Sequence, residues 1–208
     1  MIKEHSFDMV SSVLDKGLLM GGDGKIRCAW AGTDPLYCAY HDNEWGKPVF
    51  DDYRLFEKIC LEGFQAGLSW LTILKKISHF RQAFDYFNLE KIALYDEEKI
   101  TTLMLDKGIV RHQGKIRSVI NNAKKAQEVI VQWGSLSRYF WSFQPLQFER
   151  YEKVTFEILK DNPVTPASIR LAADLKKRGW TFVGPTICYA FMQAVGIVND
   201  HLEGCAFR

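Results

Sequence analysis

Two pairs of residues that commonly bind metals lie at opposite ends of this chain. Cys28 and His41 come near the start, and His201 and Cys205 come near the end. The second pair has the spacing H-x3-C, from which two side chains can reach one ion, whereas the first pair needs a loop that folds back. Two thiolates and two imidazoles are a usual ligand set for structural zinc. One ion bound by all four would require the fold to bring residue 28 to residue 205.

A second interpretation needs no metal. Buried cysteines behave as small apolar side chains, and core histidines are often hydrogen-bonded polar groups. The chain has five cysteines, an odd and widely spread set, which favours free thiols or ligands over disulfides. Cys38, Cys60 and Cys188 occupy apolar settings and are predicted core residues. Spacing alone leaves the metal-bound and metal-free interpretations open.

Apolar residues recur at helical spacing through most of the chain. Between Asp51 and Ile77 they predict two helices, with Gly63 and Gly67 at the junction. Further helices are predicted over 79–87, 88–95, 97–105, 113–132, 135–141, 166–177 and 185–194, with Asn88 and Asp96 as N-caps. Residues 144–166 carry three prolines and are predicted to form a long surface excursion that can include a short strand or helix. No stretch alternates with period two for long, so the predicted fold class is all-α.

Glycines at 21, 22 and 24 divide the chain into a predicted N-terminal extension, residues 1–25, and a single domain, residues 26–208. Within the extension, apolar spacing over residues 6–20 predicts a short amphipathic helix. No apolar run is long enough to cross a bilayer, and the first two dozen residues lack the features of a secretory signal. These features predict a cytoplasmic protein without a membrane partner, and a monomer is the default expectation.

The net charge of +2 and pI near 8.2 give only weak support for a nucleic-acid partner. The run LKKRGWTFVGPTICYAF is more specific, because a basic helix end, a glycine turn and a new helix at Pro185 follow one another. Such a hairpin lets the backbone approach a phosphate, and the free N–H groups of the second helix can bind it. DKGIVRHQGKI predicts a second basic turn. The alternative is an ordinary helix corner with solvated lysines.

The run CLEGFQAGLSWLTIL contains a carboxylate in an unfavourable place. Glu62 lies where a predicted helix ends, so its charge opposes the helix dipole. Residues that break a local rule in this way often serve function. The alternatives are a solvent-exposed glutamate at Glu62 and an ordinary core residue at Trp70.

Four long segments of the chain resemble the 3-methyladenine DNA glycosylase I family. They read RCAWAGTDPLYCAYHDNEWG, CLEGFQAGLSWLTILKK, GIVRHQGKI and KKRGWTFVGPTICYAFMQAVGIVNDHLEGC, and the match spans about residues 26 to 205. The resemblance implies a helix-hairpin-helix glycosylase fold with a zinc snap, in which one structural Zn²⁺ per chain joins the N- and C-terminal segments. Its implied ligands are Cys28, His41, His201 and Cys205. Residues 1–25 depart from the family pattern, in which the cysteine lies almost at the terminus.

The resemblance also implies the residues that contact the substrate. The base pocket would consist of Trp30, Tyr40, Glu62 and Trp70, with Glu62 and Tyr40 as the catalytic residues. Leu68 would probe the gap left in the duplex. The other implied DNA contacts are Gln65, Ala66, Gly67, Gly179, Gly184 and Thr186.

The stretch YHDNEWG, residues 40–46, would then serve two neighbouring tasks. His41 would bind the metal, and that bond would fix the backbone of Tyr40, which faces the base. The three polar residues that follow, Asp42, Asn43 and Glu44, are expected to brace the turn by hydrogen bonds. Trp45 is expected to fill the core.

The implied function is base-excision repair. A monofunctional enzyme would hydrolyse the N-glycosidic bond of 3-methyladenine flipped out of alkylated double-stranded DNA, release the free base and leave an abasic site. Asp200 is the only aspartate after the hairpin, and it adjoins a predicted ligand, so it receives no catalytic role. No lysine is placed for Schiff-base chemistry. Two other classes stay open, namely a zinc-stapled DNA-binding module without chemistry and a zinc hydrolase, although a closed four-ligand site disfavours the hydrolase.

Overall fold

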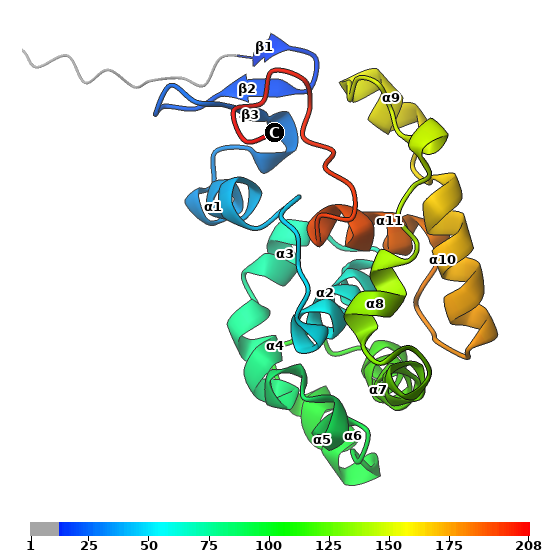
Figure 1. Cartoon of the computed structure of the whole chain (residues 1–208). Coiled ribbons are helices and arrows are strands. Elements are labelled where there is room, and N and C mark those ends of the chain that lie inside the picture. Colours follow the sequence, from blue (N-terminus) through cyan, green and yellow to red (C-terminus); the bar gives the residue numbers. More distant parts are fainter. Residues whose placement is uncertain (1–12) are drawn as a thin grey trace, which may run out of the picture.

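The computed structural model describes residues 13–208, and most of them lie in helices (Figure 1). The order along the chain is β1 (Val13–Asp15), β2 (Leu18–Met20), β3 (Ile26–Cys28), η1 (Ala29–Ala31), α1 (Pro35–Asn43), α2 (Asp52–Gln65), α3 (Trp70–Leu74), α4 (Ile77–Ala83), η2 (Asp85–Phe87), α5 (Leu89–Ile92), α6 (Glu97–Leu105), α7 (Gln113–Trp133), α8 (Leu136–Trp141), η3 (Gln147–Glu149), α9 (Phe156–Asp161), α10 (Pro166–Lys177) and α11 (Pro185–Ala194). No helix among these residues is long and apolar enough to cross a membrane.

The α2 helix lies at the centre of the helical part. Every residue from Leu55 to Phe64 is buried, because α2 packs against α3, α7, α8 and α11. Most buried residues of this interior are apolar and form one large cluster. A helix that is buried all round normally carries no charge, yet α2 buries Glu57, Lys58 and Glu62.

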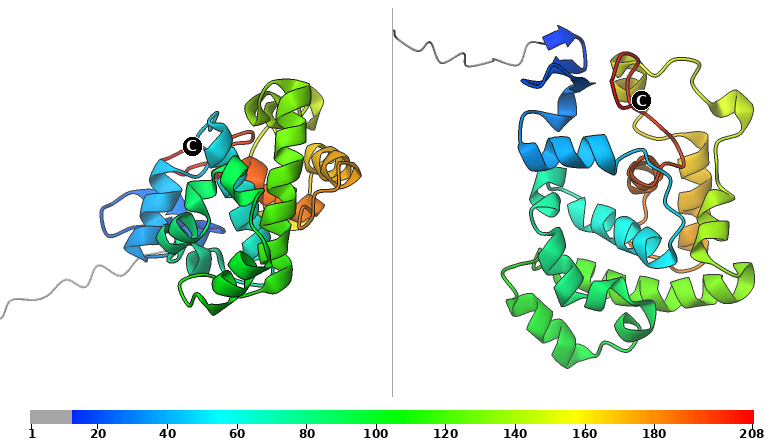
Figure 2. Two further views of the ribbon diagram at one scale, coloured as in Figure 1. Left: turned by 90° about the horizontal axis from the view of Figure 1, so that it is seen from below. Right: turned by 60° about the vertical axis from the view of Figure 1, so that its left-hand side comes forward.

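A small sheet and the C-terminal segment form the other end of the molecule (Figures 1 and 2). The strands pair antiparallel in the order β1-β2-β3, and Leu18 lies opposite Cys28. The amide of Ala206 donates to the carbonyl of Ile26, which ties the tail to β3. A second, smaller apolar cluster forms here, consisting of Leu18, Cys28, Val154, Leu202 and Cys205.

The sheet corrects one prediction and adds to another. Residues 13–15 and 18–20 form strands rather than the end of an amphipathic helix, and the fold is mostly helical, as the all-α prediction requires, but also contains this small sheet. Each strand has three residues, which is too short to show alternation in the sequence. Residues 1–12 of the predicted extension lie outside the described residues, and the division at residue 25 stays a prediction.

Most predicted helices are present. Asn88 and Asp96 cap α5 and α6 as predicted, since their side chains accept from the amides of Lys91 and Lys99. The break after α2 falls at residues 66–69 rather than at Gly63, which lies inside the helix. One helix was missed, because the apolar residues of the 35–43 segment are consecutive from 36 to 40 and do not recur at helical spacing. This is α1, which begins at Pro35 and is capped by Asp34.

Candidate active site and metal centre

The structure contains a cavity of about 240 Å³. Side chains from η1, α1, α2, α3, α9 and α11 and from the loop after α1 line it. They are Trp30, Tyr37, Tyr40, Trp45, Glu62, Gln65, Trp70, Leu159, Ala190 and Gln193. All four residues predicted for the base pocket are therefore brought together from four different elements.

The cavity wall is mostly aromatic. Tyr40 lies between two indoles, with ring centroids 5.3 Å from Trp70 and 6.5 Å from Trp30. Trp30 is 37% exposed and stands at the rim, whereas Tyr40 and Trp70 are buried. No group within residues 13–208 accepts a hydrogen bond from the buried indole N–H of Trp70. The cavity thus offers ring faces and an unused donor to a planar ligand.

Glu62 is the unusual charge of this cavity. On the same helix Glu57 accepts hydrogen bonds from two arginines, and Lys58 donates to Glu44. Glu62 is only 4% exposed, and no residue of the described chain donates a hydrogen bond to it. Burial raises the pKa of Glu62 from the ordinary 4.5 to about 8, and the charge of Lys58 opposes this shift. A buried carboxylate without a partner is costly, and a cationic ligand would supply the missing partner.

Tyr40 is held by the helix that carries it and by a buried cation. The ammonium of Lys58 lies 4.8 Å from the centre of the Tyr40 ring, and it also lies 3.0 Å from a carboxylate oxygen of Glu44. Asn43 donates to the carbonyl of Ala39 within α1. The polar run after His41 therefore braces this part of the chain, as predicted, but as a helix rather than as a turn.

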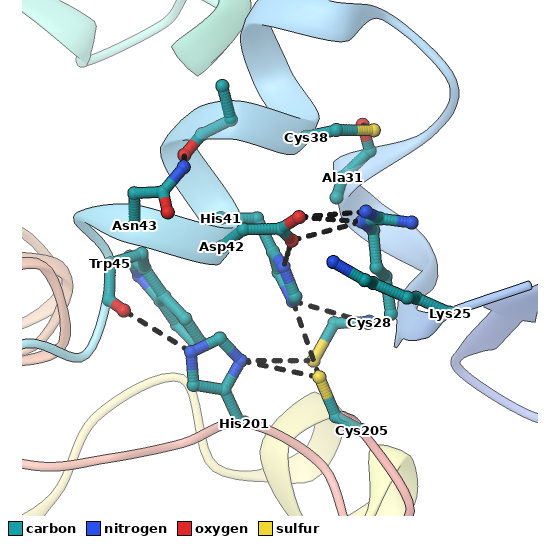
Figure 3. Close-up of polar contacts among 12 residues, drawn as sticks. Lys25, Cys28, Ala31, Cys38, His41, Asp42, Asn43, Trp45, His201 and Cys205 are labelled. Atoms are coloured by element: carbon teal, nitrogen blue, oxygen red, sulfur yellow. Dashed lines mark hydrogen bonds and ion pairs between the residues drawn. The ribbon is translucent and has the colours of Figure 1, made fainter. Parts of the chain in front are cut away.

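The four predicted metal ligands meet in one buried cluster (Figure 3). Their ligand atoms all lie within 4.8 Å of one another. The Cys205 sulfur is 3.6 Å from Nε2 of His41 and 3.6 Å from Nδ1 of His201, and the Cys28 sulfur is 3.9 Å from Nδ1 of His201. A tetrahedral zinc with bonds of about 2.3 Å to sulfur and about 2.0 Å to nitrogen requires ligand-to-ligand distances of about 3.3–3.8 Å. The cluster therefore fits a four-coordinate zinc.

The outward-facing nitrogen of each imidazole has its own acceptor. Nδ1 of His41 lies 2.8 Å from a carboxylate oxygen of Asp42, and Nε2 of His201 lies 3.2 Å from the carbonyl of Trp45. Arg27 in turn holds Asp42 through three short contacts. These acceptors keep the proton on the outer nitrogen and leave the inner lone pair for a metal.

The thiol of Cys205 points to the same use. The hydrogen bond from the Cys28 thiol is the largest cause that lowers the pKa of Cys205, and burial opposes this shift. A site that favours a thiolate is ready to bind a metal cation. With four protein ligands, such a metal would have no open position for substrate, so its role would be structural.

The metal cluster and the cavity share residues of one segment. His41 adjoins Tyr40 on α1, and both are buried. Trp45 accepts from His201 through its carbonyl and packs its ring 4.7 Å from that imidazole, while its side chain also lines the cavity. The cluster therefore helps to fix one wall of the cavity.

The predicted DNA contacts form two exposed turns that α7 holds. Lys115 donates to the carbonyls of Phe64 and Ala66 at the end of α2. Asn122 accepts from the amide of Thr181 and donates to its carbonyl, which fixes the turn between α10 and α11. Leu68 is 40% exposed at the tip of the first turn.

The second turn contains the predicted hairpin residues. Gly179 has a φ of +84°, a conformation that favours glycine, and Gly184 is the N-cap of α11, which leaves the first amides of that helix without side-chain caps. Thr186 lies in the first turn of α11. Phe182 packs near Gly63 of α2, so the hairpin lies against the helix that leads into the first turn.

The second basic turn is only partly available. Lys115 is buried against the end of α2, and Arg117 forms an ion pair with Glu97. Both residues lie on helix α7, which turns their charges toward protein partners.

Five lining residues were not predicted for the cavity, namely Tyr37, Trp45, Leu159, Ala190 and Gln193. Tyr37 lies one helical turn before Tyr40, Trp45 was assigned to the core, and Gln193 lies within α11. The sequence could have identified Gln193 as a candidate, because it is the one amide in the otherwise apolar run ICYAFMQAV.

Comparisons with known proteins agree with this geometry. The model of the methyladenine glycosylase family matches residues 30–208. DNA-3-methyladenine glycosylase 1 of Escherichia coli (strain K12) is 48% identical over 179 residues, which cover 86% of this chain and 95% of that protein.

Solved structures agree as well. A crystal structure of 3-methyladenine DNA glycosylase I superimposes with a TM-score of 0.81 at 49% identity, covering 86% of this chain and 98% of that one. A variant of 3-methyladenine DNA glycosylase I in complex with 3-methyladenine gives a TM-score of 0.76 at 35% identity, covering 86% and 96%. The chain therefore belongs to the methyladenine glycosylase family.

Proposed function

We propose that this protein excises 3-methyladenine from alkylated double-stranded DNA as a monofunctional glycosylase in base-excision repair. One observation carries the proposal, namely that the carboxylate of Glu62 is buried without a partner in an aromatic cavity. This cavity suits a planar cation. The relatives named above are DNA-3-methyladenine glycosylases, and one was solved with the free base bound.

The cavity would select the damaged base by charge. 3-Methyladenine in DNA carries a positive charge on its ring, and each aromatic face attracts a cation by about 0.5–2 kcal/mol. Glu62, once ionised, adds an opposite charge in a site of low dielectric. Neutral adenine gains neither contribution, so the same pocket would bind it less tightly.

The two turns held by α7 would grip the DNA. The target nucleotide must leave the duplex, which costs a few kcal/mol. Leu68 is an exposed apolar side chain on the 66–69 turn and would fill the gap. The uncapped amides at the start of α11, with Gly179 and Gly184 in the hairpin, would bind backbone phosphates in the manner of a helix-hairpin-helix motif.

The chemistry needs little from the protein beyond binding. A cationic purine leaves as a neutral molecule, so the leaving group needs no added proton. Asp200 accepts hydrogen bonds from Tyr189 and Gln193 and is not free to act on the sugar. Lys58 is buried and paired with Glu44, which argues against Schiff-base chemistry by this lysine. A zinc held by the Cys/His cluster would stabilise the fold and take no part in the bond cleavage.

Chromatography of bases freed from methylated DNA tests the proposal. We expect the protein to release 3-methyladenine, and Glu62→Gln and Trp70→Ala to slow this release about 100-fold or more. Glu98→Gln changes an exposed glutamate of α6 in the same chemical way and serves as the matched control.

The outcome separates the three candidate classes. Binding to methylated DNA without release of a base would identify a binding module instead. Full rates in both pocket variants would show that the cavity is not the active site. A metal centre that carries an exchangeable water would favour the hypothesis that the protein is a zinc hydrolase.

A further inference from the structure

Gln193 presents a polar group to the cavity that the proposed chemistry does not yet use. It lies on α11 and lines the cavity together with Glu62 of α2. These two helices pack against each other. An amide at this place can either donate or accept, so the direction it faces decides what it recognises.

The surrounding hydrogen bonds fix that direction. Nε2 of Gln193 donates to Oδ2 of Asp200 over 2.8 Å, and the hydroxyl of Tyr189 donates to the same oxygen over 2.6 Å. Asp200 and Tyr189 are each 5% exposed, so the pair is sheltered from water. A carboxylate only accepts, and it therefore holds the NH₂ end of the amide. The carbonyl end, Oε1, receives no hydrogen bond from any residue of the 13–208 segment.

We propose that Gln193 is a specificity-determining residue that accepts a hydrogen bond from the exocyclic amine of the flipped base, with Asp200 and Tyr189 as its positioning residues. The proposal rests on the proposed function and deepens it. The exocyclic amine of an adenine has two hydrogens. Glu62 would accept one and Gln193 the other, from two different helices.

The arrangement predicts which bases are refused. In 3-methylhypoxanthine a carbonyl oxygen replaces the exocyclic amine. This oxygen would face Oε1 of Gln193 and would leave both acceptors without a donor. Sites built around a hydrogen bond reject such analogues strongly, because buried polar groups then stay unpaired.

Fluorescence titration with the free bases tests the inference, since three tryptophans line the cavity. The probes are 3-methyladenine and 3-methylhypoxanthine, and the measured quantity is the ratio of their affinities. We expect the wild-type protein to prefer 3-methyladenine, and Gln193→Met to reduce this ratio about tenfold. Gln147→Met, at an exposed amide of η3, is the matched control and should leave the ratio unchanged. Because both affinities come from one preparation, partial loss of folding does not alter the ratio.

Variants of Asp200 test the positioning. Asp200→Ala frees the amide to rotate and should reduce the same ratio, whereas Asp200→Asn keeps an acceptor for Nε2 and should restore it. A merely structural role would lower both affinities together and leave the ratio as it was. Metal content per chain is measured in each variant, because Asp200 adjoins His201.

The outcomes distinguish this inference from the function on which it rests. A wild-type protein that releases no 3-methyladenine from methylated DNA overturns the proposed function. A wild-type protein that releases it, paired with a Gln193→Met variant of unchanged ratio, overturns the role of Gln193 alone.

Discussion

At the scale of single residues, the site depends on a charge that the folded protein holds at a cost. Glu62 is buried near the carbonyl end of α2, where the helix dipole also disfavours a negative charge. Its neighbours Glu57 and Lys58 show that this helix can bury charges when they are paired. We infer that the protein accepts lower stability at Glu62 because the ligand supplies the missing cation.

Removal of this charge should therefore stabilise the free protein. The pKa of Glu62 is about 8 when folded and near 4.5 when unfolded, so the folded state binds more protons between these values and stability falls as pH rises from about 4.5 to 8. We expect Glu62→Gln to be more stable than wild type by about 2–4 kcal/mol at pH 8.5 and nearly equal to it at pH 4.5.

Urea unfolding at both pH values measures this difference. Glu98→Gln should follow wild type throughout. A Glu62→Gln variant that is less stable at pH 8.5 would mean that the carboxylate has a partner in solution.

The same group should control the pH dependence of catalysis. The charge of 3-methyladenine in DNA comes from the methyl group and does not titrate near neutral pH. Any change of kcat/KM with pH should therefore come from a group of the enzyme. We expect kcat/KM to increase with pH up to about 8 and then to level, as Glu62 of the free enzyme ionises. The transition in kcat should lie at lower pH, because a bound cation lowers the pKa of the carboxylate.

Single-turnover rates from pH 5.5 to 9.5 give both profiles. Glu62→Gln should lose the rise in kcat/KM. A rise that survives in this variant would assign it to another group.

Some features of these residues can be predicted from the sequence, and others depend on the folded structure. The unfavourable place of Glu62 at a helix end is visible in the sequence, whereas its burial depends on α3, α8 and α11, which pack around α2 only in the fold. Trp30, Tyr40 and Trp70 follow from resemblance rather than from their own pattern. Trp45 was predicted only as a core residue, whereas its side chain belongs to the core cluster and also lines the cavity.

At the scale of elements, α7 organises the two turns proposed to contact DNA. It is the longest helix of the described chain, and its first half binds the end of α2 through Lys115 and the hairpin through Ser118 and Asn122. Helix periodicity predicted α7 well because one face is regularly apolar. It could not predict α1, whose stability comes from the Asp34 cap and from the packing of Tyr40 and His41.

Lys115 should matter for stability more than for charge. Its ammonium donates to the carbonyls of Phe64 and Ala66, and it complements the negative end of the α2 dipole. Lys115→Met keeps the apolar stem and leaves both carbonyls without their donor. We expect it to lower the free energy of unfolding by about 2 kcal/mol.

Lys124→Met changes an exposed lysine of the same helix and should cost less than about 0.5 kcal/mol. Denaturant unfolding compares the two variants. Equal stability of Lys115→Met and Lys124→Met would show that the contacts to α2 contribute nothing.

At the scale of the whole molecule, the Cys/His cluster closes the chain on itself. Cys28 and His201 are 173 positions apart, and the cluster that joins them lies in the smaller apolar core, apart from the helical one. Sequence spacing could name the four ligands as candidates, since their types fit zinc. It could not show that the two ends meet, because that contact depends on every helix in between.

Metal removal should therefore loosen one end of the molecule and leave the rest folded. Closing so long a loop stabilises a fold by about 5 kcal/mol in the chain-entropy model, and that contribution is lost with the metal. The helical core does not contain the cluster, so most helical circular dichroism should survive chelation at 25 °C. Affinity for 3-methyladenine should fall, because Tyr40 and Trp45 connect the cluster to the cavity wall.

Chelator titration with a zinc indicator, limited proteolysis and base binding are measured on one preparation. We expect about one zinc per chain, new cleavage sites first in the C-terminal tail, which holds Cys205, and recovery of base binding when zinc is returned. Arg27→Met removes the support of Asp42 and should weaken zinc binding about tenfold, whereas Arg170→Met, at a surface ion pair, should not. A protein that contains no metal and resists proteolysis equally with and without chelator would show that hydrogen bonds and packing alone join the two ends.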